Sequence, residues 1–511
     1  MDICVLVLAW LGFTYAVAHG GRAVCYDAFR DMAYGQGILR GRFWEDPTLP
    51  GYPAWYPPGS AMLFASLSWL TRVAVSDLYM TSAYWLGWIN PVALYLLVRA
   101  HWGRGAALLS LPMTLLGSYW WLIHAAMPIP SVQGVAFGLF TLLAWKRARQ
   151  GGLRWALACG VLGSLAFWHH PVCAGVALGA IAVHGALGPW LASAGEGKPA
   201  GAGAARFALT GRAGLVLMVG AALSAPLLVR QLGLARVNAA PHHWFAPELH
   251  DPRFALHAAS PLIVPLGLLG LFWGLREWRR SGWLVGYFVV ALAGEVAGYL
   301  GHDLRWTVPW VLPHEFQWHE QLALAVAAVA ATFQCADLLA ARLRPRHRAL
   351  VHSAAVLGIV ALTLGPALPS LQVADSWLIR IDQRWRNTLA TAEWVRNQTP
   401  ASSVFVCSPD AGYILAGLTG RKCIALPIGH MNPASNPEAR LSDLYELVST
   451  RDEMAFLRLA RRYGASYVLV DPAMEASSGM ERIYSGWSSL ERMPVPGDAV
   501  PVYRIRPAAE H

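Results

Sequence analysis

Residues 283–300 read WLVGYFVVALAGEVAGYL, an apolar run in which Glu295 is the only charged side chain. A run of about 20 apolar residues is the length that an α-helix needs to cross a membrane. Similar runs recur from Met1 to about Leu368, and 56% of the 511 residues are hydrophobic while only 14% are charged. This composition is typical of a polytopic membrane protein and not of a set of soluble domains.

Short connectors rich in arginine separate these runs, for example Lys146–Arg149 and Arg276–Arg280. Such connectors stay in the cytoplasm, so we place them on the inner side and the C-terminal segment on the outer side. We expect the protein to lie in the cytoplasmic (inner or plasma) membrane. The turn Arg99–Arg104 conflicts with this scheme, because an outer first loop followed by two spans puts it outside. We therefore expect about 11 to 13 transmembrane helices. The span that is wrongly assigned or missing should lie within the first hundred residues. The candidate spans are residues 2–18, 59–75, 79–98, 105–122, 130–145, 154–168, 172–192, 213–230, 259–275, 283–300, 320–340 and 349–367.

The net charge of +10 does not indicate nucleic-acid binding, because the basic residues lie in the connectors.

At the N-terminus, Ala16–Ala18 fits a signal-peptide cleavage site, but no basic region precedes the apolar run, so we favour a retained first span. No metal-type cysteine spacing is present, and we expect Cys407 and Cys423 to stay unpaired, at opposite ends of neighbouring strands.

The first outer loop, residues 20–57, is long and polar and ends in a proline-rich stretch. Such a loop is usually functional, or it forms helices that lie on the membrane. Asp27 follows the first span closely, where a carboxylate is partly desolvated and can act as a general base or hold a divalent metal. The alternative is that Asp27 only caps a short helix over residues 27–41. Asp31 is the second acidic candidate in the same segment.

Residues 369–511 have the periodicity of a small soluble domain, which we place outside the cytoplasm, after a transmembrane domain over residues 1–368. Apolar runs at Val404–Cys407, Cys423–Leu426 and Tyr467–Asp471 predict short buried strands. The spacing in Asp452–Tyr463 predicts a helix. Strands that alternate with helices indicate a parallel sheet.

The first loop resembles that of the GT-C superfamily of glycosyltransferases, which take sugars from polyprenyl-phosphate or polyprenyl-diphosphate carriers. The resemblance rests on Asp27, on Leu39 after eleven intervening residues, on Gly41, and on the step Pro57-Pro58 into the next helix. Weaker similarity continues through Gly160–Pro171 and the start of the tail. The resemblance implies a GT-C-like fold, with Asp27 as the carboxylate that activates the acceptor or binds a metal.

Two departures from the family narrow the reaction. Ser408–Gly412 stands where oligosaccharyltransferases carry a Trp-Trp-Asp motif, which argues against transfer to asparagine. The second outer loop, His124–Pro130, has no acidic pair, which favours a lipid monophosphate donor without a metal. A leaving phosphate needs cations and hydrogen-bond donors. The candidates in predicted outer loops are Arg305, His314, His319, His169 and His170.

Each of these histidines also has a plainer interpretation: it lies at the membrane interface without a specific role, or its ring nitrogens make structural hydrogen bonds. A metal cluster of these histidines with Glu315 is a further alternative, but the five-residue spacing from His314 to His319 matches no known zinc-helix signature. The sequence requires no cofactor and leaves a divalent metal open.

We therefore expect an inverting glycosyltransferase that moves a sugar from a polyprenyl-phosphate carrier to an envelope glycan, lipid or protein. Two other functions compete with it. A non-catalytic protein that binds lipid or assists assembly would keep the fold. A secondary transporter would be expected to show several ionisable residues in mid-membrane and an internal repeat. Glu295 is the only acidic residue well inside an apolar run, which makes a transporter the weaker alternative.

Overall fold

The fold is that of a computed structural model, which describes residues 23–115, 121, 129–191, 202–237, 260–303, 313–341, 345–365, 379–380, 386–496 and 500–507. The chain divides into two compact units. One contains most of the apolar helices, and the other joins Gly20–Ser82 to Ile379–His511. The first outer loop therefore belongs to the same unit as the tail, whereas the domain division at residues 368 and 369 stays a prediction.

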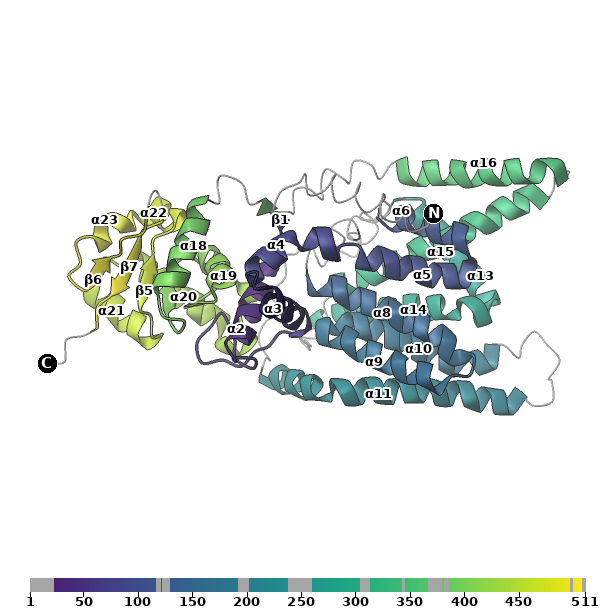
Figure 1. The fold of residues 1–511 in the computed structure, drawn as a ribbon, viewed down its shortest axis with the longest axis horizontal. Helices are drawn as coiled ribbons and strands as arrows, with labels where there is room; N and C mark the ends of the chain where they lie inside the picture. The colour runs from purple at the N-terminus through teal and green to yellow at the C-terminus, as the bar shows by residue number, and fades with distance from the viewer. Residues whose placement is uncertain are drawn as a thin grey trace. The chain divides into compact units, whose positions relative to one another are not determined.

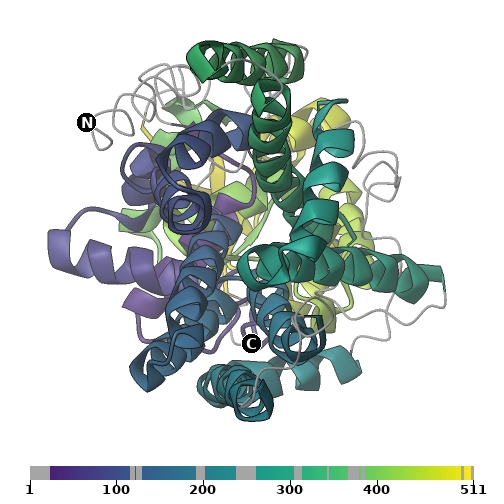
Figure 2. The ribbon, with the colours of Figure 1, turned by 90° about the vertical axis from the view of Figure 1, so that its right-hand side faces the viewer.

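The first unit is an all-helical bundle among the described residues. Figure 1 shows α5, α8, α9 and α10 running alongside one another, and Figure 2 views the bundle from its end. Small residues let the helices approach closely: a Cβ on Gly270 of α13 would lie 2.0 Å from the Ala327 carbonyl oxygen of α15. The helices are α5 (Ile89–Trp102), α6 (Arg104–Leu115), α8 (Pro130–Arg149), α9 (Leu153–His169), α10 (Pro171–Leu191), α11 (Ala202–Val237), α13 (Ile263–Arg276), α14 (Trp278–Asp303), α15 (Pro313–Ala341) and α16 (Pro345–Leu364).

Five of the described helices are long and apolar enough to cross a membrane, or six if one bent pair counts as a single span. They lie in α10, α11, α14, α15 and α16. The chain is thus a polytopic helical membrane protein, as its composition predicts. The total of about 11 to 13 spans stays a prediction, since the remaining candidates are shorter helices and residues 2–18 lie outside the described part.

The structure shows at which end of the bundle the turn Arg99–Arg104 lies. Arg280 Nε donates a hydrogen bond to the His101 carbonyl oxygen at 2.8 Å, and Arg99 and Arg147 line one groove. The turn therefore lies at the same end of the bundle as the basic connectors Lys146–Arg149 and Arg276–Arg280. This agrees with the expectation that the conflict comes from the spans assigned in the first hundred residues, and not from the turn itself.

The helices α3 (Gly59–Thr71) and α4 (Val75–Leu86) bear on the number of crossings in the first hundred residues. They are bent by 115° at their junction, and α3 groups with the tail. A chain bent this sharply does not make one straight crossing. Removing residues 59–75 from the twelve candidates leaves eleven spans and places every basic connector on one side.

The second unit contains a five-stranded sheet in the order β4-β3-β5-β7-β6. The strands β4 (Lys422–Cys423), β3 (Val404–Val406) and β5 (Tyr467–Leu469) are parallel, which confirms the predicted pairing. The strands predicted at Val404–Cys407 and Tyr467–Asp471 are present, whereas the one predicted at Cys423–Leu426 overlaps β4 at Cys423 alone. The strands β6 (Leu490–Arg492) and β7 (Val502–Ile505) extend the sheet in antiparallel fashion, which the sequence analysis missed. A separate pair joins β1 (Ala23–Val24) to β2 (Ile379–Arg380).

Helices surround this sheet, and one matches its prediction closely. In α21 (Glu453–Arg462) the carboxylate of Asp452 accepts hydrogen bonds from the Met454 and Ala455 amides, so Asp452 caps the predicted helix. The other elements of the unit are α2 (Ala28–Leu39), α18 (Arg386–Gln398), α19 (Pro409–Thr419), α20 (Pro437–Ser449), α22 (Pro472–Ser478), α23 (Met480–Tyr484) and the 3-10 turns η5 (Ile428–His430) and η6 (Pro433–Ser435).

Helix α2 of the first loop packs directly on α19 of the tail. A Cβ on Gly417 would lie 2.7 Å from the Phe29 carbonyl oxygen, so glycine is what permits this approach. The guanidinium of Arg40 donates to the carbonyl oxygens of Thr419 and Gly420 at 3.0 and 2.7 Å. A cation bonded to the carbonyls that end a helix is favourable. Arg40 thus fastens the first loop to the C-terminal end of α19.

The sulfur atoms of Cys407 and Cys423 lie 4.0 Å apart, and both cysteines are free. Placing them at opposite ends of adjacent strands was wrong, because Cys423 pairs with Phe405, two residues before Cys407. Both side chains are buried in the sheet region.

Candidate functional site

Asp27 stands at the N-terminus of α2, where the sequence suggested either a base or a helix cap. Its side chain makes no capping hydrogen bond, although the residue occupies the N-cap position. The side chain is 47% exposed, so the carboxylate is accessible from outside the protein. The capping alternative thus lacks the contact that defines it, and the carboxylate remains available for chemistry.

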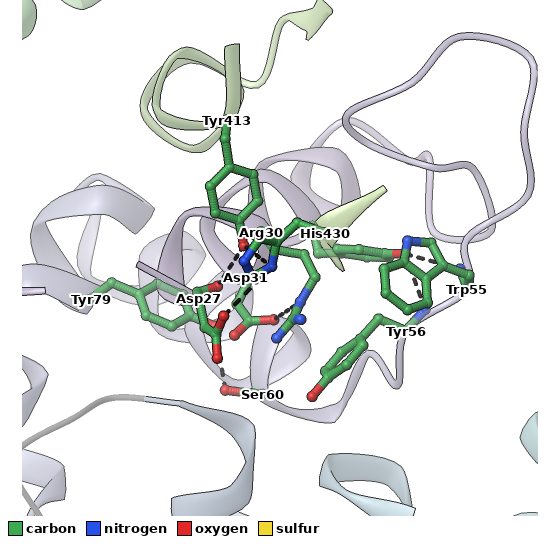
Figure 3. A network of polar contacts seen from close by, with 10 residues as sticks. Asp27, Arg30, Asp31, Trp55, Tyr56, Ser60, Tyr79, Tyr413 and His430 are labelled. Carbon is green, nitrogen blue, oxygen red and sulfur yellow. Dashed lines mark hydrogen bonds and ion pairs between the residues drawn. The ribbon is translucent and has the colours of Figure 1, made fainter. Parts of the chain in front are cut away.

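His430 and Tyr413 of the tail face this carboxylate, as Figure 3 shows. His430 Nδ1 lies 3.5 Å from Asp27 Oδ1, and the Tyr413 hydroxyl lies 3.2 Å from the same nitrogen. The Tyr413 hydroxyl also donates to the Asp27 carbonyl oxygen at 3.4 Å, and its ring stacks on His430 with centroids 4.6 Å apart. First loop and tail therefore build the surroundings of Asp27 together.

Burial sets the charge of this cluster. Burial lowers the pKa of His430, and the nearby Asp27 carboxylate offsets only part of that effect. Burial raises the pKa of the Tyr413 phenol well above its usual value. At neutral pH the imidazole and the phenol are therefore both neutral, and the contact between Asp27 and His430 is a carboxylate beside a neutral ring rather than a full ion pair.

Asp31 lies one turn further along α2 in a different environment. It is 2% exposed, and its Oδ1 accepts a hydrogen bond from Arg30 Nε at 3.3 Å. The Arg30 guanidinium is also buried and lies 3.5 Å from the centre of the Tyr56 ring. A carboxylate that neutralises a buried arginine is a structural partner. The environment thus separates the two acidic candidates and favours Asp27 as the reactive one.

The other residues of the first-loop motif have local structural explanations. Leu39 is the last residue of α2, and Gly41 follows with φ of +77°, a conformation that favours glycine. Pro58 occupies the N-cap position of α3, directly before Gly59. The spacing from Asp27 to Leu39 is therefore the length of one helix, which fixes where α2 begins and ends.

Three of the histidines proposed for the donor phosphate have partners in the helical bundle. His169 Nδ1 lies 2.9 Å from the Leu165 carbonyl oxygen, and His319 Nδ1 lies 2.5 Å from the Tyr287 hydroxyl. His170 Nε2 lies 3.4 Å from Glu315 Oε1, which joins the end of α9 to the start of α15. Each contact uses one ring nitrogen, and His169 Nε2 and His170 Nδ1 are buried without a hydrogen-bond partner among the described residues. A role of these histidines in phosphate binding stays a prediction.

The remaining two candidates for the phosphate are less defined. His314 packs on Trp318 with ring centroids 5.5 Å apart, whereas Arg305 lies outside the described residues. Within the described part of the chain, no group of three or more His, Cys, Asp or Glu side chains could hold a metal ion. His430 Nδ1, at 3.5 Å from Asp27 Oδ1, is a possible ligand beside Asp27, but Arg30 places a positive charge nearby. This set of donors does not fit a divalent metal.

Sequence reasoning missed the roles of His430 and Tyr413. His430 belonged to a long series of outer histidines with nothing to distinguish it, and Gly412-Tyr413 appeared only as a weak point of family resemblance. Tyr413 is 386 residues and His430 is 403 residues from Asp27 along the chain. Only the packing of α2 on α19 brings them together.

No protein-family model matches the sequence, and no curated protein matches it. Solved structures do match the fold. The oligosaccharyltransferase of Archaeoglobus fulgidus, solved with a tethered acceptor peptide, aligns with a TM-score of 0.58 and 14% identity over 93% of this chain and 69% of its own. The same enzyme has also been solved with a dolichol-phosphate.

Two further glycosyltransferases align over nearly the whole chain. ArnT from Cupriavidus metallidurans, also solved with undecaprenyl phosphate, aligns with a TM-score of 0.55 and 14% identity over 98% of this chain and 97% of its own. The mycobacterial arabinofuranosyltransferase AftD aligns with a TM-score of 0.56 and 15% identity over the full chain but only 40% of its own. The chain therefore has a GT-C-like fold, at a sequence distance that shows the fold alone.

Proposed function

We propose that the protein is a membrane glycosyltransferase that moves a sugar from a polyprenyl-phosphate carrier to an acceptor hydroxyl, with Asp27 as the general base. The observation that supports this most is the environment of Asp27: an accessible carboxylate without a capping bond, beside a neutral imidazole. Two structures with the same fold hold a dolichol-phosphate or an undecaprenyl phosphate, which supports a lipid-linked donor here.

In this reaction the Asp27 carboxylate takes the proton of the acceptor hydroxyl, and the hydroxyl oxygen attacks the anomeric carbon. The bond from that carbon to the phosphate oxygen breaks, and the polyprenyl phosphate leaves with the electron pair. Attack opposite the leaving group inverts the anomeric centre. A phosphate needs no proton in order to leave, so a single base is sufficient.

His430 and Tyr413 act as positioning residues in this proposal. The Tyr413 hydroxyl contacts both the Asp27 backbone and His430 Nδ1, and so fixes the imidazole beside the carboxylate. Because the imidazole is neutral, it does not form a full ion pair with Asp27. In our proposal the donor phosphate meets Arg305, His314, His319, His169 and His170, and the acceptor is an envelope glycan, lipid or protein on the extracytoplasmic face.

The test is sugar transfer by the purified full-length protein with a labelled polyprenyl-phosphate sugar and a mixture of envelope acceptors. We expect transfer from the monophosphate donor, because no metal-type donor set surrounds Asp27 among the described residues. A matched polyprenyl-diphosphate sugar serves as the control donor. Transfer from the diphosphate donor alone, and only with added divalent metal, would contradict the proposed donor class. Absence of transfer from any lipid-linked donor would favour the non-catalytic lipid-binding alternative.

A further inference from the structure

A groove of about 660 Å³ opens on the side of the helical bundle where α5, α8 and α9 meet. Its wall is mainly apolar, with Leu96 from α5 and Phe140 and Leu143 from α8. Two arginines, Arg99 and Arg147, also line it. The groove belongs entirely to the bundle and involves none of the residues proposed for catalysis.

The two arginines are exposed and lie near the C-terminal ends of α5 and α8. None of the described residues that line the groove is acidic, and the sequence contains neither Asp nor Glu between Asp77 and Glu196. The helix dipole favours cations at these helix ends. The helix dipole alone does not explain why the guanidinium groups of both arginines border the same apolar groove. This part of the bundle therefore attracts an anion that also carries an apolar chain.

Trp155, near the start of α9, lines the same groove and is 39% exposed. An exposed tryptophan sits best at the level of the lipid headgroups. The arginines lie in the basic connectors or next to them, at the end of the bundle that we expect to face the cytoplasm. The charged part of the groove thus lies at headgroup level, and its apolar wall lies at the level of the acyl chains.

We propose that this groove binds an anionic diacyl phospholipid of the leaflet at which the basic connectors lie. Its phosphodiester lies between Arg99 and Arg147, and one acyl chain follows Leu96, Phe140 and Leu143. Basic pockets between membrane helices on the cytoplasmic side are known to suit such headgroups. Two arginines near the membrane surface are expected to strengthen the binding of an anionic headgroup over a zwitterionic one by about 30-fold.

The test is native mass spectrometry of the purified full-length protein with phosphatidylglycerol or phosphatidylcholine of identical acyl chains. We expect the wild type to bind phosphatidylglycerol about 30-fold more tightly. The double variant Arg99→Gln with Arg147→Gln should bring this preference close to one. Since both side chains are exposed, its thermal unfolding without added lipid should match the wild type.

The matched control is Arg276→Gln with Arg348→Gln, which removes two exposed connector arginines that do not line the groove. It should keep the preference. Equal affinity of the wild type for both lipids, or an equal loss in the control variant, would overturn the proposal. A third arm offers undecaprenyl phosphate in competition. If it displaces phosphatidylglycerol from the wild type but not from the double variant, the groove is a site for the carrier lipid instead.

Discussion

Gly417→Ala tests whether the packing of α2 on α19 positions the site. A Cβ at this position would lie 2.7 Å from the Phe29 carbonyl oxygen and 2.8 Å from the Phe29 Cα. Both are backbone atoms and cannot rotate away. Ordinary contacts of a Cβ begin at 3.4 Å, so α2 must move by the difference, about 0.7 Å. The substitution therefore displaces the helix that begins next to Asp27.

Crowding of this kind costs about 1–3 kcal/mol, and replacing a helical glycine by alanine returns about 0.5–1 kcal/mol. The difference is a net loss of up to about 2.5 kcal/mol in the free energy of unfolding of this unit. The contact of 3.5 Å between Asp27 and His430 lengthens as α2 moves. Since a misplacement of about 1 Å can cost about 10²-fold, turnover should fall by about tenfold or more.

Thermal unfolding and sugar transfer measure the two effects. Gly175→Ala in α10 is the matched control, because a Cβ there meets no atom within 4 Å. It should leave both the stability and the rate at or above the wild-type values. A Gly417→Ala protein with wild-type stability and turnover would refute the claim that this contact sets the position of Asp27.

Three further predictions concern topology, pH and thiols. Reporter fusions after Arg104 and Arg346 should report one side of the membrane and a fusion at the C-terminus the other; one side for all three would contradict the scheme. The folded state holds the pKa of His430 below its unfolded value of about 6.5. As pH falls through that value, the unfolded chain takes up a proton that the folded chain does not, so the free energy of unfolding should drop. His430→Gln should lack this pH-dependent loss of stability, and a pH profile equal to that of the wild type would contradict the prediction. Cys407 and Cys423 should both react as thiols after denaturation without reductant, despite the 4.0 Å between their sulfur atoms; a deficit of two thiols would show a disulfide.

The sequence predicted those features that depend on local periodicity. Apolar runs located the helices of the bundle, and short buried runs located β3, β4 and β5, because burial of a continuous stretch leaves a direct trace in hydrophobicity. Asp27 was chosen as the candidate base because it closely follows a predicted span and opens a charged loop, and its role stays a prediction. The spacing between Asp27 and Leu39 in the first-loop motif corresponds to the length of the helix Ala28–Leu39.

The features that were missed depend on contacts between distant segments. The proximity of His430 and Tyr413 to Asp27 requires α2 to pack on α19, which no local pattern encodes. The bend of 115° between α3 and α4 was hidden because both helices are apolar, and hydropathy does not report direction. The strands β6 and β7 are antiparallel additions whose charged residues, such as Arg492 and Arg504, interrupt the apolar pattern.

The central claim is that the Asp27 carboxylate takes the acceptor proton, and the rate of sugar transfer by purified Asp27→Asn tests it most directly. The substitution keeps the shape of the side chain and removes no capping bond. We therefore expect normal folding and a loss of turnover of about 10²-fold or more. Asp31→Asn is the comparison: it leaves the buried Arg30 without its carboxylate, so stability should fall by about 3–5 kcal/mol. Full turnover in Asp27→Asn, or loss of activity in a stably folded Asp31→Asn alone, would contradict the account.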